Sequence, residues 1–251
     1  MRIHLPLALI AASAASANAA SVVSPPGVPD SSTPIPFLVT TNDARSVRYQ
    51  QVYGASDFAN QGSPQYLITE IHFEGGEGSG PLAVTLPDVQ IFFSTTARSP
   101  DSLSPVFANN LGPNNTLVYS GLIDWTSGSG PFAFHIPMQR PFLYDWNAGN
   151  LLMEVRNYQT VPPLPAGPWG TERLFAGVSI LGDSTSLAVA WDVNSPTALL
   201  GSGGLWTMFT VTGVPEPASA FLFLVGLSAL ALRTWTRRAR VQSSRGPAGT
   251  Q

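Results

Sequence analysis

The chain has 251 residues, no cysteine and no lysine, and its 15 acidic residues and 12 arginines give a formal net charge of −3. Without cysteine the protein has neither disulfide bonds nor a cysteine nucleophile, so a folded domain depends on packing alone. Residues 20–213 carry 14 of the acidic residues and six of the arginines, a net charge of −8. Such a surface repels the nucleic-acid backbone, and we expect no nucleic-acid partner.

The N-terminal residues 1–19 have the three parts of a secretory signal peptide. Arg2 supplies the positive start, residues 5–15 form a short apolar core, and Ala17 and Ala19 flank Asn18 in an A-x-A cleavage pattern. We therefore expect a signal peptide with cleavage at this alanine pair, and export of the chain. Residues 20–36 are rich in proline and serine and show no periodicity, which predicts an extended linker.

The central residues 37–213 have the size of one large all-β domain. They consist of short β-prone runs separated by turn residues, and no helix-length window has a convincing helical period. Eleven strands are predicted, at residues 37–40, 46–53, 66–73, 82–86, 89–95, 116–120, 132–136, 151–157, 174–180, 187–193 and 205–211. Their number and irregular spacing favour a two-sheet sandwich of jelly-roll type as the cargo domain.

The run at residues 66–73 alternates apolar and polar side chains, as a half-buried strand does. The two predicted faces are Leu67, Thr69, Ile71 and Phe73 on one side and Ile68, Glu70 and His72 on the other. Glu70, His72 and Glu74 share a face at period two and could be presented to one metal ion. A polar solvent face is the more ordinary outcome of sheet patterning, and we predict neither a metal nor a cofactor.

Catalytic patterns are weak in this chain. His72 and His135 are the only histidines of residues 20–213, and no Gly-x-Ser-x-Gly nucleophile elbow accompanies them. The paired carboxylates of a glycoside hydrolase cannot be selected from 14 acidic residues by sequence. No catalytic residue is therefore predicted.

The tryptophans are a better indication of binding, because exposed aromatic rings stack on sugar rings. Trp125 and Trp169 lie beside loops rich in glycine and proline, and we predict them as glycan contacts. Trp191 and Trp206 fall within predicted strands and are expected to be structural.

The C-terminal region combines an extended acidic tripeptide with an apolar run. The prolines of Pro215-Glu216-Pro217 fix φ and hold Glu216 in an extended segment. Residues 218–232 contain no charge, but these 15 residues are short against the roughly 20 that a spanning helix needs. Extension to residue 235 recovers most of the difference, and we predict a transmembrane helix at 218–235.

A cluster of arginines follows the apolar run and sets its orientation. Its members are Arg233, Arg237, Arg238 and Arg240. The positive-inside bias places this end in the cytoplasm and the bulk of the chain outside. Residues 241–251 are polar and predict a disordered cytoplasmic tail.

The tripeptide, the apolar helix and the arginine cluster, within residues 214–240, together resemble the PEP-CTERM sorting signal of exported bacterial proteins. The resemblance implies Pro215, Glu216 and Pro217 as the recognition element and the arginines as the stop-transfer cluster. It further implies that an exosortase, a membrane-embedded cysteine peptidase, cleaves or transfers the chain near the tripeptide. Family members usually stop soon after the basic cluster, so the tail at 241–251 is a departure.

These features predict a protein that is anchored transiently in the inner membrane by its C-terminus and then reaches the cell surface or the extracellular space. The interpretation we favour is a noncatalytic surface or extracellular-matrix protein with polysaccharide as the candidate ligand. The alternative is a secreted polysaccharide-active hydrolase that carries the same sorting signal.

Overall fold

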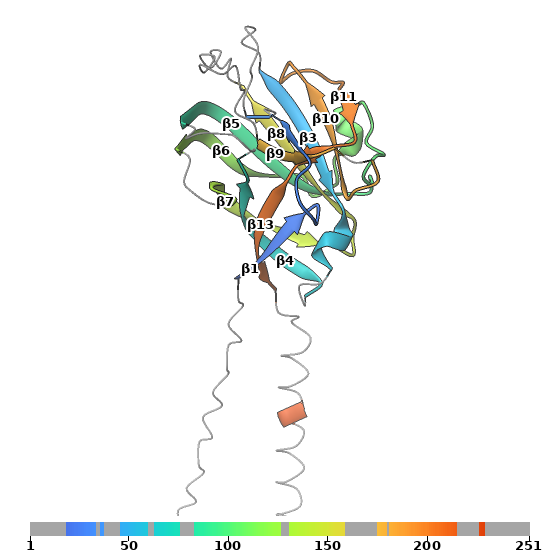
Figure 1. The fold of residues 1–251 in the computed structure, drawn as a ribbon. Coiled ribbons are helices and arrows are strands. Elements are labelled where there is room, and N and C mark those ends of the chain that lie inside the picture. Colours follow the sequence, from blue (N-terminus) through green and yellow to red (C-terminus); the bar gives the residue numbers. More distant parts are fainter. Residues whose placement is uncertain are drawn as a thin grey trace, which may run out of the picture. The chain divides into compact units, whose positions relative to one another are not determined.

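A computed structural model describes residues 19–33, 36–37, 46–59, 63–75, 83–126, 131–158, 175–179, 181–214 and 226–228. The chain divides into two compact units, Met1–Val214 and Pro215–Gln251. The described part of the first unit is built from β-strands and two short 3-10 helices (Figure 1), which confirms the predicted all-β class. In the second unit only a helical turn at residues 226–228 is described. Within the described residues no helix has the length and apolarity needed to cross a membrane.

The described strands form three antiparallel sheets. The four-stranded sheet has the order β1 (Ala19–Ser24), β13 (Thr207–Gly213), β4 (Gln65–Phe73), β7 (Phe134–Asp145). The six-stranded sheet has the order β11 (Leu199–Gly201), β10 (Thr185–Ala190), β3 (Val47–Tyr53), β8 (Asn150–Asn157), β5 (Ala83–Thr96), β6 (Thr116–Thr126). The three-stranded sheet has the order β12 (Gly204–Leu205), β9 (Phe175–Val178), β2 (Ser31–Thr33). The 3-10 helices are η1 (Ala55–Phe58) and η2 (Phe107–Asn110).

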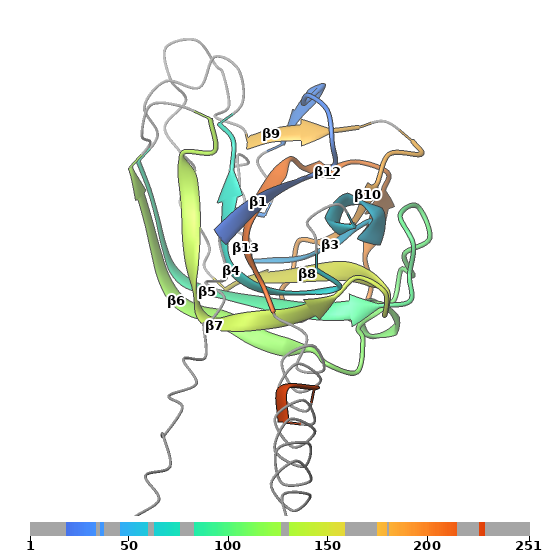
Figure 2. The ribbon, with the colours of Figure 1, turned by 90° about the horizontal axis from the view of Figure 1, so that it is seen from below.

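One aromatic-rich core lies between the four-stranded and six-stranded sheets. Phe93 of β5 contacts Phe142 of β7 and Phe209 of β13, with ring centroids 5.7 and 6.3 Å apart. Phe175 brings the three-stranded sheet into the same core and is fully buried. Figure 2 shows β5, β6 and β7 curving together along one side of the domain. Because the chain has no cysteine, the packing of large buried rings stabilises this core without disulfide bonds.

The predicted linker at residues 20–36 is wrong, because two strands of the fold lie in it. All six residues of β1 pair with β13, from Ala19 opposite Thr212 to Ser24 opposite Thr207. β2 pairs with β9. These short segments have little apolar periodicity of their own, and their strand conformation comes from partners that are distant in sequence.

Several predicted strand boundaries also change. The runs at 82–86 and 89–95 form the single strand β5, because a register irregularity between Leu86 and Val89 accommodates the intervening Pro87 and Asp88. β6 and β7 continue beyond their predicted ends at 120 and 136. Residues 38–40 of the first predicted strand lie outside the described residues.

A bulge in β4 corrects the predicted faces of residues 66–73. The register with β13 passes from Ile68 to Glu70 without Thr69, and the register with β7 shifts at the same place. The alternation changes phase there, so Ile68 joins Ile71 and Phe73 in the core, whereas Leu67 is only partly buried. Glu70 and His72 remain together on the outer face.

Candidate functional site

The outer face of the six-stranded sheet is covered by the chain segment between β5 and β6. This cover contains η2, and its Phe107 is fully buried against Val52 and Leu152 of the sheet. Asn110 Nδ2 donates to Gln50 Oε1 at 2.9 Å, and Gln50 Nε2 donates to the Phe107 carbonyl at 3.2 Å. The face is therefore an interior surface with a small core of its own.

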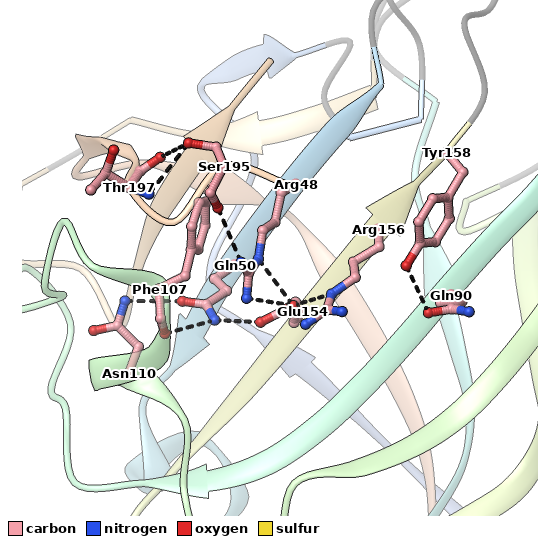
Figure 3. A network of polar contacts seen from close by, with 10 residues as sticks. All are labelled: Arg48, Gln50, Gln90, Phe107, Asn110, Glu154, Arg156, Tyr158, Ser195 and Thr197. Atoms are coloured by element: carbon pink, nitrogen blue, oxygen red, sulfur yellow. Dashed lines mark hydrogen bonds and ion pairs between the residues drawn. The ribbon is translucent and has the colours of Figure 1, made fainter. Parts of the chain in front are cut away.

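A buried ionic network continues beneath this cover (Figure 3). Glu154 of β8 has a side-chain exposure of 1% and receives the guanidinium groups of Arg48 at 3.2 Å and Arg156 at 2.5 Å. Gln50 Nε2 donates to the second carboxylate oxygen at 2.5 Å. Arg48 also donates to the Ser195 carbonyl at 3.1 Å and lies 4.4 Å from the centre of the Phe107 ring.

The network has the properties of a structural element. Both Glu154 oxygens are occupied by donors from the protein, so the buried carboxylate is not available as a base. Burial lowers the pKa of Arg156, but the hydrogen bond and charge of Glu154 outweigh it, and the net pKa is raised. The Arg156 guanidinium is thereby held as a cation.

The outer face of the four-stranded sheet is different, and we call it the open face. It comprises the outward side chains at the β13 N-terminus, the β4 C-terminus and the β7 N-terminus, namely Glu70, His72, Glu74, Phe132, His135, Trp206, Met208 and Thr210. His135 is exposed, and the other seven are partly buried. This set brings together both histidines of the β domain.

The two histidines lie opposite each other across β4 and β7. Their ring centroids are 5.9 Å apart with an interplanar angle of 34°. His72 Nε2 is 3.3 Å from Glu70 Oε2 and 2.9 Å from Thr210 Oγ1. Burial is the largest influence and lowers the pKa of His72, with His135 acting in the same direction and Glu70 opposing it. A lowered pKa keeps this imidazole neutral at pH 7.

This arrangement does not form a hydrolase triad. In a triad the imidazole uses one nitrogen for the nucleophile and the other for the carboxylate. Here Glu70 and Thr210 both approach Nε2, and the ring has a further hydrogen bond to the backbone of Phe132. The hydroxyl of Thr210 consequently lacks the proton relay that would activate it.

An aromatic pair lies beside the histidines. Phe132 packs on Trp206 with centroids 4.6 Å apart and an interplanar angle of 39°. The Trp206 indole donates to the Pro25 carbonyl at 3.1 Å, and the Phe132 N–H donates to Glu74 Oε2 at 2.5 Å. Phe132 has a φ of 55°, an uncommon conformation that the bond to Glu74 holds in place. The pair is held in position by two further chain segments, one at Pro25 and one at Glu74.

Glu74 therefore does not join Glu70 and His72 in a metal site. Its oxygen is engaged by the Phe132 N–H. Among the residues that the structure describes, no group of three or more histidine, aspartate or glutamate side chains is arranged to hold a metal ion.

Two other carboxylates are unusual. Asp57 Oδ2 accepts hydrogen bonds from the Ser24 and Ser184 hydroxyls at 2.5 and 2.6 Å, and burial raises its pKa. Asp183 Oδ1 accepts from the Thr185 N–H at 2.8 Å, whereas its Oδ2 is buried and has no partner among the described residues. Burial raises the pKa of Asp183 as well. Neither carboxylate has a histidine among its hydrogen-bond partners in the described part of the chain.

The predicted glycan contact at Trp125 is not supported by its position. Trp125 is 7% exposed, and its indole donates to the His135 carbonyl at 3.1 Å. Phe37, Phe134 and Phe175 surround the ring at centroid distances of 5.0 to 5.7 Å. A ring packed in this way has no free face for a sugar. Trp169 lies outside the described residues.

The two tryptophans predicted to lie within strands lie just outside them. Trp191 follows the end of β10 and is 38% exposed, so the strand prediction for it is wrong. Trp206 lies between β12 and β13 and belongs to the open face. The inward alternation of Leu205, Phe209 and Val211 was the sequence signal that could have placed Trp206 outward.

The predicted processing sites are described only in part. Ala19 is the first residue of β1, whereas Ala17 lies outside the described residues. Pro215, Glu216, Pro217 and the arginines at 233, 237, 238 and 240 lie outside them too. Comparison with protein-family models, curated proteins and solved structures found no match to this chain.

Proposed function

We propose that the chain is an exported bacterial protein of the cell surface or extracellular matrix, sorted by an exosortase-type peptidase through residues 214–240. The C-terminal segment at 218–235 is its transient inner-membrane anchor, and residues 241–251 are the cytoplasmic tail. The β domain acts without catalysis, as a binding or matrix component with polysaccharide as its candidate ligand. We further propose a jelly-roll type for its packed sheets.

The observation that carries this proposal is the pairing of the first and last strands. Ala19, beside the proposed signal-peptide cleavage site, lies opposite Thr212 near the end of β13. Val214 still belongs to the fold, since its N–H donates to the Gln65 carbonyl at 3.1 Å. The tripeptide at 215–217 follows at once. Cleavage after Ala19 and within 215–218 would therefore remove one β1 residue and leave all of β13.

The geometry of the open face supports the noncatalytic interpretation. His72 is the histidine with carboxylate and hydroxyl neighbours, and both approach the same ring nitrogen. The buried Glu154 is saturated by two arginines and a glutamine. The polysaccharide-active hydrolase remains the second candidate because the acidic side chains of Asp57 and Asp183 interact electrostatically.

Sorting is tested by mass spectrometry of the mature protein isolated from the source cells. We expect an N-terminus at Ala20 and a C-terminus between residues 215 and 218. Glu216→Ala should leave the full-length form in the membrane, whereas the control Glu77→Ala removes a carboxylate outside the signal and should be processed normally. An intact Gln251 on released protein would contradict the proposal.

Catalysis is tested by incubating the released protein with a panel of bacterial and plant polysaccharides and measuring new reducing ends. We expect none above the buffer blank. Release of reducing ends that is lost in Asp57→Asn or Asp183→Asn would replace the noncatalytic role by the hydrolase.

A further inference from the structure

The open face has the chemistry of a carbohydrate site. Trp206, immediately before β13, and Met208 and Thr210 of β13 occupy every second position along the chain. At about 3.4 Å per residue they extend over roughly 14 Å, which suits a chain of linked rings better than a single one. The row begins with an aromatic side chain and ends with a hydroxyl group, which are the two kinds of group that sugars contact.

The neighbouring strands supply a second row of polar groups. Glu70 and His72 of β4 lie directly beside Thr210 and Met208, and His135 of β7 lies opposite His72. Their side chains offer carboxylate and imidazole acceptors and donors to sugar hydroxyl groups. Glu70 retains a side-chain exposure of 39%, so its contact with the His72 ring leaves it accessible.

The aromatic pair is held rigidly before any ligand arrives. The Trp206 indole is fixed by Pro25, and Phe132 is fixed by Glu74. Holding φ at 55° in Phe132 has a conformational cost that the fold sustains at this one half-buried position. Preorganised rings lose little conformational entropy on binding, which favours recognition of a flexible polymer.

The charge of the open face selects the class of glycan. Among the described residues that make up this face, the ionic side chains are the carboxylates of Glu70 and Glu74, and none is an arginine. His72 is neutral at pH 7 because burial lowers its pKa. Such a surface repels carboxylated or sulfated polysaccharides and accepts uncharged ones.

The position of the face in the fold is consistent with a ligand site. β1 begins beside the end of β13, at Ala19 and Thr212. The aromatic pair lies at the opposite end of the same sheet, where β13 begins at Thr207 and β4 ends at Phe73. The aromatic pair is thus separated along the sheet from the paired residues Ala19 and Thr212.

From this combination we infer that the open face binds an uncharged polysaccharide, with Phe132 and Trp206 stacking on sugar rings and Glu70, His72 and His135 bonding their hydroxyl groups. The inference rests on the proposed binding role of the β domain and is independent of sorting. Failure of sorting is detected by the chain termini of the mature protein, and failure of this inference by binding measurements alone.

The experiment uses the full chain solubilised in detergent and titrated calorimetrically with dextran, mannan and a soluble β-glucan, with alginate as the anionic comparison. We expect binding of at least one of the three neutral polymers and none of alginate. Phe132→Ala should weaken binding by tenfold or more. Trp191→Ala is the matched control, since it removes an exposed aromatic ring at the end of β10, and its affinity should be unchanged.

Thermal unfolding of each variant separates loss of binding from loss of the fold. If Phe132→Ala is unfolded, Phe132→Leu replaces it, because leucine keeps the apolar bulk without the aromatic ring. The affinity of this variant for the neutral polymers then tests whether the ring of Phe132 is needed for binding. The inference is overturned if none of the three neutral polymers binds, if alginate binds best, if a folded Phe132 variant retains full affinity, or if Trp191→Ala abolishes binding.

Discussion

The outer faces of the two main sheets carry similar polar side chains, but a glutamate is buried on one face and exposed on the other. On the six-stranded sheet Glu154 and its two arginines are enclosed by the segment that contains Phe107. On the four-stranded sheet the side chain of Glu70 lies 3.3 Å from the neutral ring of His72 and is 39% exposed. The same kinds of polar group therefore serve the fold on one sheet and remain available for a ligand on the other.

The two faces differ in whether hydrogen-bond donors from the protein occupy both oxygens of the carboxylate. A buried charge is tolerated only when donors occupy each of its oxygens, and Glu154 meets that requirement. A solvated carboxylate has no such requirement, so Glu70 can exchange partners at little cost. Pairing and exposure, more than residue type, distinguish structural from functional polar groups in this domain.

The comparison predicts its largest difference in the free energy of unfolding when one carboxylate is removed from each face. Glu154→Ala leaves Arg48 and Arg156 without their buried partner and should destabilise the domain by about 3–5 kcal/mol. Glu70→Ala is the matched variant on the open face and should cost less than about 1 kcal/mol. Urea unfolding of both variants measures the difference. Equal losses would remove the distinction between the two faces.

A smaller effect is expected at Asp183, in the turn that leads into β10, because one of its buried carboxylate oxygens has no hydrogen-bond partner among the described residues. Because burial raises its pKa, folding favours the protonated form, so this group stabilises the fold at low pH and loses that contribution as pH rises through its folded-state pKa. Asp183→Asn should raise stability at pH 7, by at most about 1 kcal/mol because the carboxyl group is partly exposed.

The gain from Asp183→Asn should disappear when pH is lowered to 4, as followed by thermal unfolding at both pH values. Asp124→Asn, an exposed change on β6, serves as the control and should leave stability unaltered. Destabilisation of Asp183→Asn at pH 7 would mean that its buried oxygen has a partner.

The smallest effects concern His72 and sharpen the description of the open face. Its lowered pKa means that the fold favours the neutral ring, so stability is lost as pH falls from about 6.5 through the folded-state pKa. Glu70→Gln should lower the pKa of His72 further, and His135→Gln should raise it. NMR titration of the His72 ring protons measures both. Shifts in the same direction would contradict the described charge environment.

Much of the β domain was predictable from local pattern. The strands at 46–53 and 151–157 are confirmed nearly residue for residue as β3 and β8, because strong apolar alternation and flanking turn residues mark them. The sequence also indicated that Glu70 and His72 share a face. Long-range pairing was not predictable, and β1 was missed because its strand conformation depends on β13, almost 190 residues later.

The open face likewise depends on contacts between distant segments, which could not be predicted from the sequence. Its aromatic pair joins Phe132 to Trp206, and its histidine pair joins β4 to β7, so neither is visible in any short window of sequence. Trp125 has the neighbouring glycines of a loop residue, yet the length of β6 carries it into the core. A side chain's exposure follows from what packs on it, which spacing alone does not specify.

The sequence by itself determined that this chain lacks disulfide bonds and predicted that its central part is all-β. Those properties are local, since they depend on residue type and short-range order. Only the tertiary structure decided which carboxylates are buried, that Trp125 lies in the core, and that β1 and β13 are neighbours. These properties depend on contacts between distant segments, and such contacts exist only once the sheets have packed.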